Sequence, residues 1–92
     1  MPLHVSEDFL QFNYMPDDTI YDEKRYFEEE GTQKFDSTSA KQMLIMMNHL
    51  SSKLDLDAYA LKRLEVMLHE DLPFFTINRR LVFKFASENF LY

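Results

Sequence analysis

The chain contains no cysteine, only one glycine and no long apolar run. Without cysteine it cannot form a disulfide scaffold, a thiolate zinc site or a cysteine nucleophile. The lone Gly31 excludes the loops that cradle phosphates or dinucleotides, because those loops need several glycines for close backbone approach. No stretch reaches the roughly 18 apolar residues that a membrane-spanning helix requires.

The first residues also lack the pattern of a secretory signal. His4, Glu7 and Asp8 stand where a signal peptide would need a basic patch followed by an apolar stretch. Together with the absence of cysteine, this favours a soluble protein of the cytoplasm.

What the chain does contain is enough apolar material for one compact core. Of the 92 residues, 46% are hydrophobic and 15% are aromatic. A length of this order is typical of one domain. We therefore expect a single domain spanning residues 1–92, in which an acidic, aromatic-rich segment (1–37) precedes a second part (38–92).

The negative charge is concentrated in that acidic segment. Residues 1–37 hold ten aspartates and glutamates against three bases, whereas residues 38–92 hold six acids and seven bases. The net charge of the whole chain is −6. Such an asymmetry concerns partners and solubility and does not determine the fold.

Two helices are predicted in the middle of the chain. Ser37, Thr38 and Ser39 can cap a helix over about residues 40–53, and Asp55 or Asp57 can cap a second one over about 57–70. Apolar residues recur at helical spacing in both, and Pro73 must follow the end of the second. The short connection between them predicts an antiparallel helix pair.

The flanking regions are predicted to be β structure, which makes the expected fold class α+β. Residues 10–14 alternate apolar and polar side chains, as a half-buried strand does. Residues 74–77 and 81–85 are aromatic and β-branched, which indicates a C-terminal β-hairpin. The alternative is a mainly α protein, because Ile77, Leu81 and Phe85 also share one face of a helix.

Residues 19–30 allow two conformations. Thr19 and Asp22 have the spacing of a helix cap, with Gly31 beyond the end of such a helix. However, Glu28, Glu29 and Glu30 would crowd the negative end of its dipole. A hairpin that turns at Glu30 and Gly31 therefore has the preference, as part of an acidic N-terminal β region.

The acidic segment is the first candidate binding surface. Carboxylates on a rigid scaffold can occupy the basic surface of another protein, and a dense ordered array of them can mimic the charge of nucleic acid. The alternative is a solvated face that keeps the domain soluble. The candidate partner-binding residues are Asp17, Asp18, Asp22, Glu23, Glu28, Glu29 and Glu30.

Phe74 and Phe75 complete this candidate surface. Neighbouring residues of an extended segment face opposite ways, so both rings cannot enter the core of one monomer. One of them is expected to meet a partner protein or a second subunit, and a homodimer through the aromatic C-terminal region is one interpretation.

A second set of residues suggests contact with DNA. A helix pair followed by a β-hairpin is the order of elements in a winged helix, whose second helix enters the major groove while the wing touches phosphate. The basic residues on those elements would be Lys62, Arg63, Arg79, Arg80 and Lys84. The acidic balance of the whole chain works against this interpretation.

Nothing in the sequence indicates catalysis, a metal site or a cofactor. No serine stands in a nucleophile-elbow context, and His4, His49 and His69 lack the spacing of a helical zinc site. We therefore expect a small acidic, non-enzymatic regulatory or inhibitory protein that binds a partner protein with a basic surface. The alternative is a winged-helix-like DNA-binding transcriptional regulator. By analogy, compact chains without cysteine are common among phage and bacterial accessory proteins.

Overall fold

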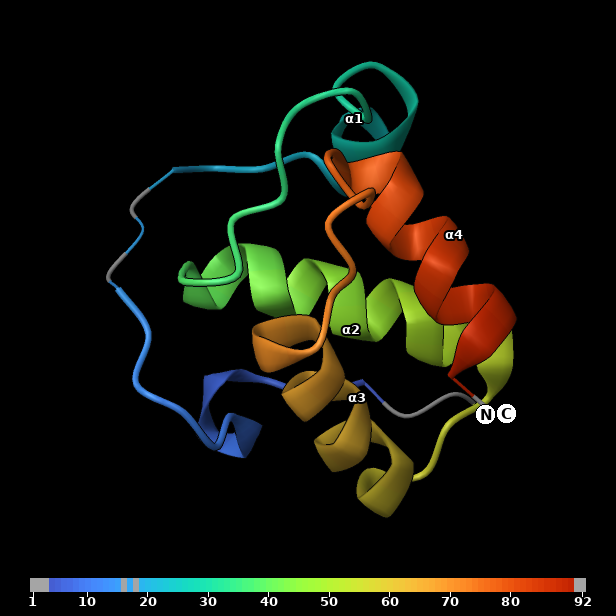
Figure 1. Cartoon of the computed structure of the whole chain (residues 1–92). Coiled ribbons are helices and arrows are strands. Elements are labelled where there is room, and N and C mark those ends of the chain that lie inside the picture. The colour runs from blue at the N-terminus through green and yellow to red at the C-terminus, as the bar shows by residue number, and fades with distance from the viewer. Residues whose placement is uncertain (1–3, 16, 18, 91–92) are drawn as a thin grey trace.

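The computed structural model describes residues 4–15, 17 and 19–90. In chain order the described elements are a 3-10 helix η1 (Glu7–Phe9) and the α-helices α1 (Glu23–Glu28), α2 (Ala40–Leu54), α3 (Ala58–Glu70) and α4 (Arg79–Asn89). Figure 1 shows α2 across the middle of the molecule, with α3 and α4 packed around it. The acidic segment wraps around this three-helix unit.

The two predicted central helices are confirmed, and their caps explain where each helix starts. The Ser39 hydroxyl accepts a hydrogen bond from the Gln42 N–H at the start of α2. The Asp57 carboxylate accepts one from the Ala60 N–H at the start of α3. Asp55 ends α2 in a left-handed conformation with φ 54°, so the chain reverses within three residues.

The core lies between α2, α3 and α4. Its fully buried apolar side chains include three methionines and one leucine of α2, three leucines of α3, and Val82 and Ala86 of α4. Tyr26 and Phe35 of the acidic segment close one side of it. The α2 methionines Met43, Met46 and Met47 are fully buried in this core.

The predicted C-terminal hairpin is wrong, because residues 79–89 form α4. The Asn78 side chain caps this helix by accepting a hydrogen bond from the Leu81 N–H at 2.9 Å. Val82 and Ala86, one turn apart, face the core. Burial of this face outweighs the β propensity of the local sequence, which spans only about 1 kcal/mol per residue.

The predicted N-terminal β region is also wrong, because the described residues form no sheet. Residues 10–14 are an irregular segment, and the only β contact described is an isolated bridge between Met15 and Ser39. Residues 23–28 form α1, whose first turn is capped by the Asp22 carboxylate. The fold class is therefore small and helical, not α+β.

Tertiary contacts stabilise α1 against the negative charge that argued for a hairpin. Tyr26 is only 1% exposed and donates its hydroxyl hydrogen bond to Gln42 Oε1 on α2. Arg79 and Arg80, more than fifty residues away in sequence, reach the carbonyl end of α1. Basic groups at this end offset the helix dipole and the glutamates beside it.

Candidate functional site

Several carboxylates of the predicted acidic surface form contacts within the chain, and Asp17 is the clearest case. Its carboxylate accepts hydrogen bonds from the Tyr21 hydroxyl at 2.8 Å, from the Thr19 N–H at 2.9 Å and from the Ser39 hydroxyl. These donors, the Ser39 hydroxyl foremost, hold the pKa of Asp17 well below its usual range. Asp17 therefore ties Thr19 and Tyr21 to the start of α2.

Three other predicted acids also have structural partners. Asp22 caps α1, and Glu29 pairs with Arg25 at 2.8 Å. Glu30 lies 3.6 Å from Arg79 and 4.0 Å from Arg25. Glu28 is exposed, whereas Asp18 and the side chain of Glu23 lie outside the described part of the chain. The acids thus do not form one array of unpaired carboxylates.

Arg79, predicted to contact DNA, is buried. It is 5% exposed, and its guanidinium lies over the Tyr26 ring at 3.8 Å from the ring centre. Its Nη1 donates long hydrogen bonds to the carbonyls of Tyr26 and Glu30. Burial raises the pKa of the Tyr26 phenol, and the Arg79 charge partly opposes that shift. Arg79 therefore positions α1 and is not available to phosphate.

Arg80 is also engaged, while the remaining predicted bases stay on the surface. Arg80 donates to the carbonyls of Phe27 and Glu28 at the end of α1. Lys62, Arg63 and Lys84 are exposed on α3 and α4. Lys62 lies over the Phe9 ring at 5.1 Å. With the hairpin replaced by α4, the wing that would bring these bases to DNA does not form.

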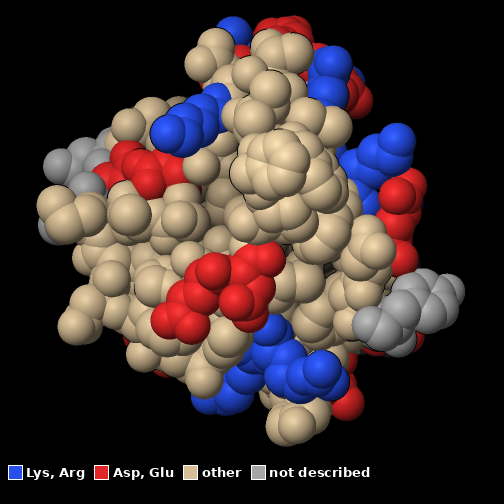
Figure 2. All heavy atoms as spheres, viewed as in Figure 1, with Lys and Arg blue, Asp and Glu red and all other residues tan. Residues whose placement is uncertain are grey.

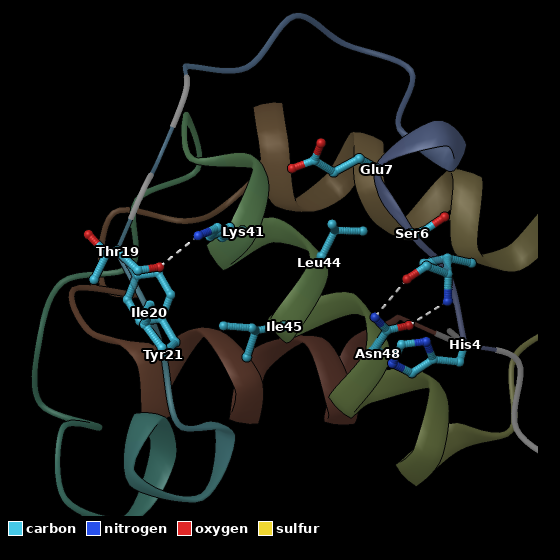
Figure 3. A pocket seen from close by; sticks show the side chains of 11 residues that line it. His4, Ser6, Glu7, Thr19, Ile20, Tyr21, Lys41, Leu44, Ile45 and Asn48 are labelled. Atoms are coloured by element: carbon cyan, nitrogen blue, oxygen red, sulfur yellow. Dashed lines mark hydrogen bonds between the residues drawn. The ribbon is translucent and has the colours of Figure 1, made fainter.

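A different feature emerges where the acidic segment crosses α2. Thr19, Ile20 and Tyr21 form an extended ridge between two hollows, which we call the Ile20 ridge. Ile20 is 94% exposed, although it is a large apolar side chain. A hydrogen bond from α2 holds the ridge, because Lys41 Nζ donates to the Thr19 carbonyl at 2.9 Å. Figure 3 shows this contact beside the ridge.

The first hollow beside the ridge has a volume of about 470 Å³ and an apolar floor. Leu44 and Ile45 rise from α2 between the ridge and residues 4–7, as Figure 3 shows. Asn48 fixes the opposite wall by accepting from the Val5 N–H at 2.7 Å and donating to the Val5 carbonyl at 3.0 Å. The hollow is therefore formed by fixed backbone segments on both sides.

The second hollow lies on the other side of the ridge and carries charge. It has a volume of about 550 Å³ and is lined by Asp22, Glu30, Arg25 and Tyr26 in addition to the ridge itself. The structure thus brings two of the predicted acids, Asp22 and Glu30, next to an exposed apolar side chain. Ile20 was missed by the sequence analysis, because one isoleucine between polar residues carries no periodic signal.

The predicted aromatic pair lies elsewhere. Phe74 and Phe75 are 94% and 52% exposed in the connection between α3 and α4, and Ile77 is 68% exposed. A ring contact links the pair to α4, since the Phe75 ring lies 5.9 Å from that of Phe85. Figure 2, viewed as in Figure 1, shows a broad uncharged area over the connection between α3 and α4, with acidic and basic groups around it. We call Phe74, Phe75, Ile77, Leu81 and Phe85 the aromatic strip.

The most deeply buried acid is one that the sequence analysis did not single out. Glu65 of α3 is fully buried, and its carboxylate accepts from the Gln11 N–H at 2.9 Å and from the Tyr14 hydroxyl. Burial, together with the hydrogen bond to Glu65 and its negative charge, raises the pKa of the Tyr14 phenol. The Phe12 and His69 rings stack beside this contact at 4.2 Å.

This cluster anchors the acidic segment to α3 and lines neither hollow beside the Ile20 ridge. A glutamate at a helical core position is the one sequence signal that could have indicated it, because buried carboxylates need donors from elsewhere in the chain.

The described residues show no group of three His, Asp or Glu side chains placed to hold a metal ion. Within the same part of the chain, every helix is too short or too polar to cross a bilayer. None of the protein families, curated proteins or solved structures with which we compared the chain is detectably similar to it. The functional proposal therefore depends on the geometry of the ridge.

Proposed function

We propose that the chain is a small acidic, non-enzymatic regulatory or inhibitory protein that binds a partner protein through the Ile20 ridge. One observation carries the proposal: Ile20 is 94% exposed on a segment that hydrogen bonds hold in place. An apolar side chain presented on an ordered backbone loses little entropy on binding, which favours affinity.

The two hollows define what the ridge can accept. Partner side chains that enter the first hollow would cover the apolar floor formed by Leu44 and Ile45. The second hollow, where Asp22 and Glu30 lie beside Arg25, would suit polar or charged side chains of the partner. Apolar burial at the centre with charges at the rim is the usual anatomy of a protein interface.

Acidic side chains around the ridge would mainly accelerate and orient the encounter. Exposed charges contribute more to association rate and specificity than to affinity, and salt screens them. Mimicry of nucleic acid is not part of the proposal, because the carboxylates of Asp17, Glu29 and Glu30 are paired with other groups of the same chain. The basic residues Lys62, Arg63 and Lys84 keep DNA binding as the competing hypothesis, although no specific contact favours it.

Capture from an extract of the native host tests the proposal. The wild-type protein would be immobilised beside Ile20→Asp and beside Tyr59→Asp, which alters a side chain that is 72% exposed on α3. We expect one set of captured proteins to be lost with Ile20→Asp and kept with Tyr59→Asp. Equal capture by all three proteins would refute the role of the ridge.

The same immobilised proteins distinguish the competing hypothesis. Random duplex DNA that binds to the wild type and dissociates steeply with added salt would indicate a DNA-binding protein. Lys62→Gln combined with Arg63→Gln should then weaken the binding. We expect no such binding, and capture that depends on Ile20 at every salt concentration.

A further inference from the structure

The helix α4 has apolar side chains on two sides, but the core covers only one of them. Val82 and Ala86 are buried against the core, with 1% and 0% exposure. Leu81 and Phe85, four residues apart on the other side, are half-buried and do not pack against the core cluster. In Figure 1 α4 lies at the edge of the molecule, with α2 along one side.

Residues of the α3–α4 connection extend this uncovered side. The Phe75 ring contacts Phe85 edge to face, and Phe74 contacts Phe75 in the same way at 5.8 Å. Ile77 lies in the connection four residues before Leu81, outside α4, and is 68% exposed. The contacting rings of Phe74, Phe75 and Phe85 thus form one apolar surface, and Ile77 and Leu81 are the other apolar members of the aromatic strip. Monomeric proteins rarely leave such a surface open unless it binds something.

Two opposite charges lie on the same side of α4 as the strip. Lys84 follows Leu81 by three residues, and Glu88 follows Phe85 by three, so all four share one helix face. Both charged side chains are exposed. Neither has an ion-pair partner among the residues that the structure describes, although their spacing would allow a pair within the helix.

We propose that the aromatic strip binds a second copy of this chain, with the two α4 helices antiparallel about a twofold axis beside Phe85. With a rise of about 1.5 Å per residue, Lys84 of one copy then lies within about 3 Å, measured along the helix axis, of Glu88 of the other. In a twofold interface each such contact occurs twice.

The charge pattern is what selects a second copy over an unrelated protein. A strip that carries one lysine and one glutamate in this order is complementary to itself only in the antiparallel orientation. A parallel arrangement would place Lys84 opposite Lys84 and Glu88 opposite Glu88, which repels. Ile20 and the hollows beside it contain no residue of the strip, so this proposal stands or falls separately from the one above.

Sedimentation equilibrium on the full chain tests the dimer, over protein concentrations from about 5 µM to about 500 µM, the range for a small interface. We expect the apparent mass to rise from one chain to two. Phe85→Gln together with Phe74→Gln should leave the protein monomeric throughout. Tyr59→Gln is the matched control, since it removes an exposed aromatic side chain outside the strip and should dimerise like the wild type.

Charge exchange supplies a test that a folding defect cannot imitate. Lys84→Glu or Glu88→Lys alone should weaken the dimer about tenfold, because two attractive pairs become repulsive. The double variant with both changes should regain wild-type dimerisation, and an equimolar mixture of the two single variants should form a mixed dimer. Circular dichroism would check that each variant keeps its helices.

Two outcomes would overturn the proposal. One is a wild type that stays monomeric up to the highest concentration, which would leave the strip to a different partner. The other is a dimer whose stability does not change in any charge variant, which would place its interface elsewhere on the surface.

Discussion

The acidic segment and the three-helix unit of α2, α3 and α4 are held together by different kinds of interaction. In the three-helix unit, leucine and methionine side chains at helical spacing bury one another. The acidic segment buries Val5, Tyr26 and Phe35 in the core, but most of its apolar side chains are only partly buried against it. It is also attached by polar contacts between residues that lie far apart in sequence, such as Val5 with Asn48 and Gln11 with Glu65.

That difference has a physical consequence. Apolar burial stabilises in proportion to area and does not require one exact geometry, whereas a polar contact stabilises only when donor and acceptor meet. A destabilising substitution in the three-helix unit should therefore unfold the whole chain. A substitution that removes one long-range hydrogen bond should instead disorder the acidic segment, including the Ile20 ridge, while the helices remain folded.

The largest effect is expected from Leu64→Ala in the core. Leu64 is fully buried on α3, where the shortened side chain leaves a cavity. We expect a loss of about 2–5 kcal/mol in the free energy of unfolding, with the acidic segment and the helices unfolding together. Denaturant titration followed by both circular dichroism and tyrosine fluorescence would check this, and two separate transitions would contradict it.

The next largest effect is expected from Gly31→Ala. Gly31 is buried where the acidic segment meets α4, and its carbonyl accepts from the Arg80 N–H at 3.1 Å. A Cβ atom there would lie 2.3 Å from the Phe27 carbonyl oxygen and 2.3 Å from Arg80 Nε. We expect a loss of about 1–3 kcal/mol from this overpacking. Thermal unfolding would measure it, with the exposed Thr32→Ala as the matched control.

A smaller effect is expected from Tyr14→Phe, which removes one donor from the buried Glu65 carboxylate. We expect a loss of about 1–2 kcal/mol. More informative is where it appears: amides of residues 5–15 should exchange hydrogen faster, while those of α2 and α3 keep their protection. Uniformly faster exchange in both regions would mean that the two regions are not separable.

The smallest effect, and the one that depends on pH, is expected from Asp17. Its pKa is lowered in the folded protein, so its ionised form stabilises the fold above the pKa of the unfolded chain. That contribution is lost as pH falls below about 4, because the unfolded state then binds more protons. Asp17→Asn should be less stable than the wild type near neutral pH. Thermal unfolding should show this difference shrinking as pH falls below 4.

Sequence patterns predicted the part of the fold that is stabilised by apolar side chains at helical spacing. Both central helices were correct to within one residue, because apolar stripes and local caps such as Ser39 and Asp57 are visible in the chain. The two ends were wrong for one common reason. Helices α1 and α4 support each other through Arg79, Arg80 and Gly31, and contacts across fifty residues leave no local pattern.

The candidate site was predicted only in part. The sequence placed acidic residues in the right region, but it could not show that Asp17 bonds to Ser39 or that Glu30 faces Arg79. Nor could it show that the Ile20 side chain is exposed to solvent. In the same way the aromatic pair Phe74 and Phe75 was singled out from an incorrect strand, and it is the packing of Phe75 on Phe85 that gives the pair its place.

Hydrogen exchange on the full chain at neutral pH tests the central claim most directly, which is that polar contacts order the acidic segment. The account predicts slow exchange for the Val5, Gln11 and Met15 amides, which donate to Asn48, Glu65 and Thr38. Their protection should be smaller than that of α2 but well above that of an unfolded chain. Free exchange throughout residues 5–15 beside a protected α2 would contradict it.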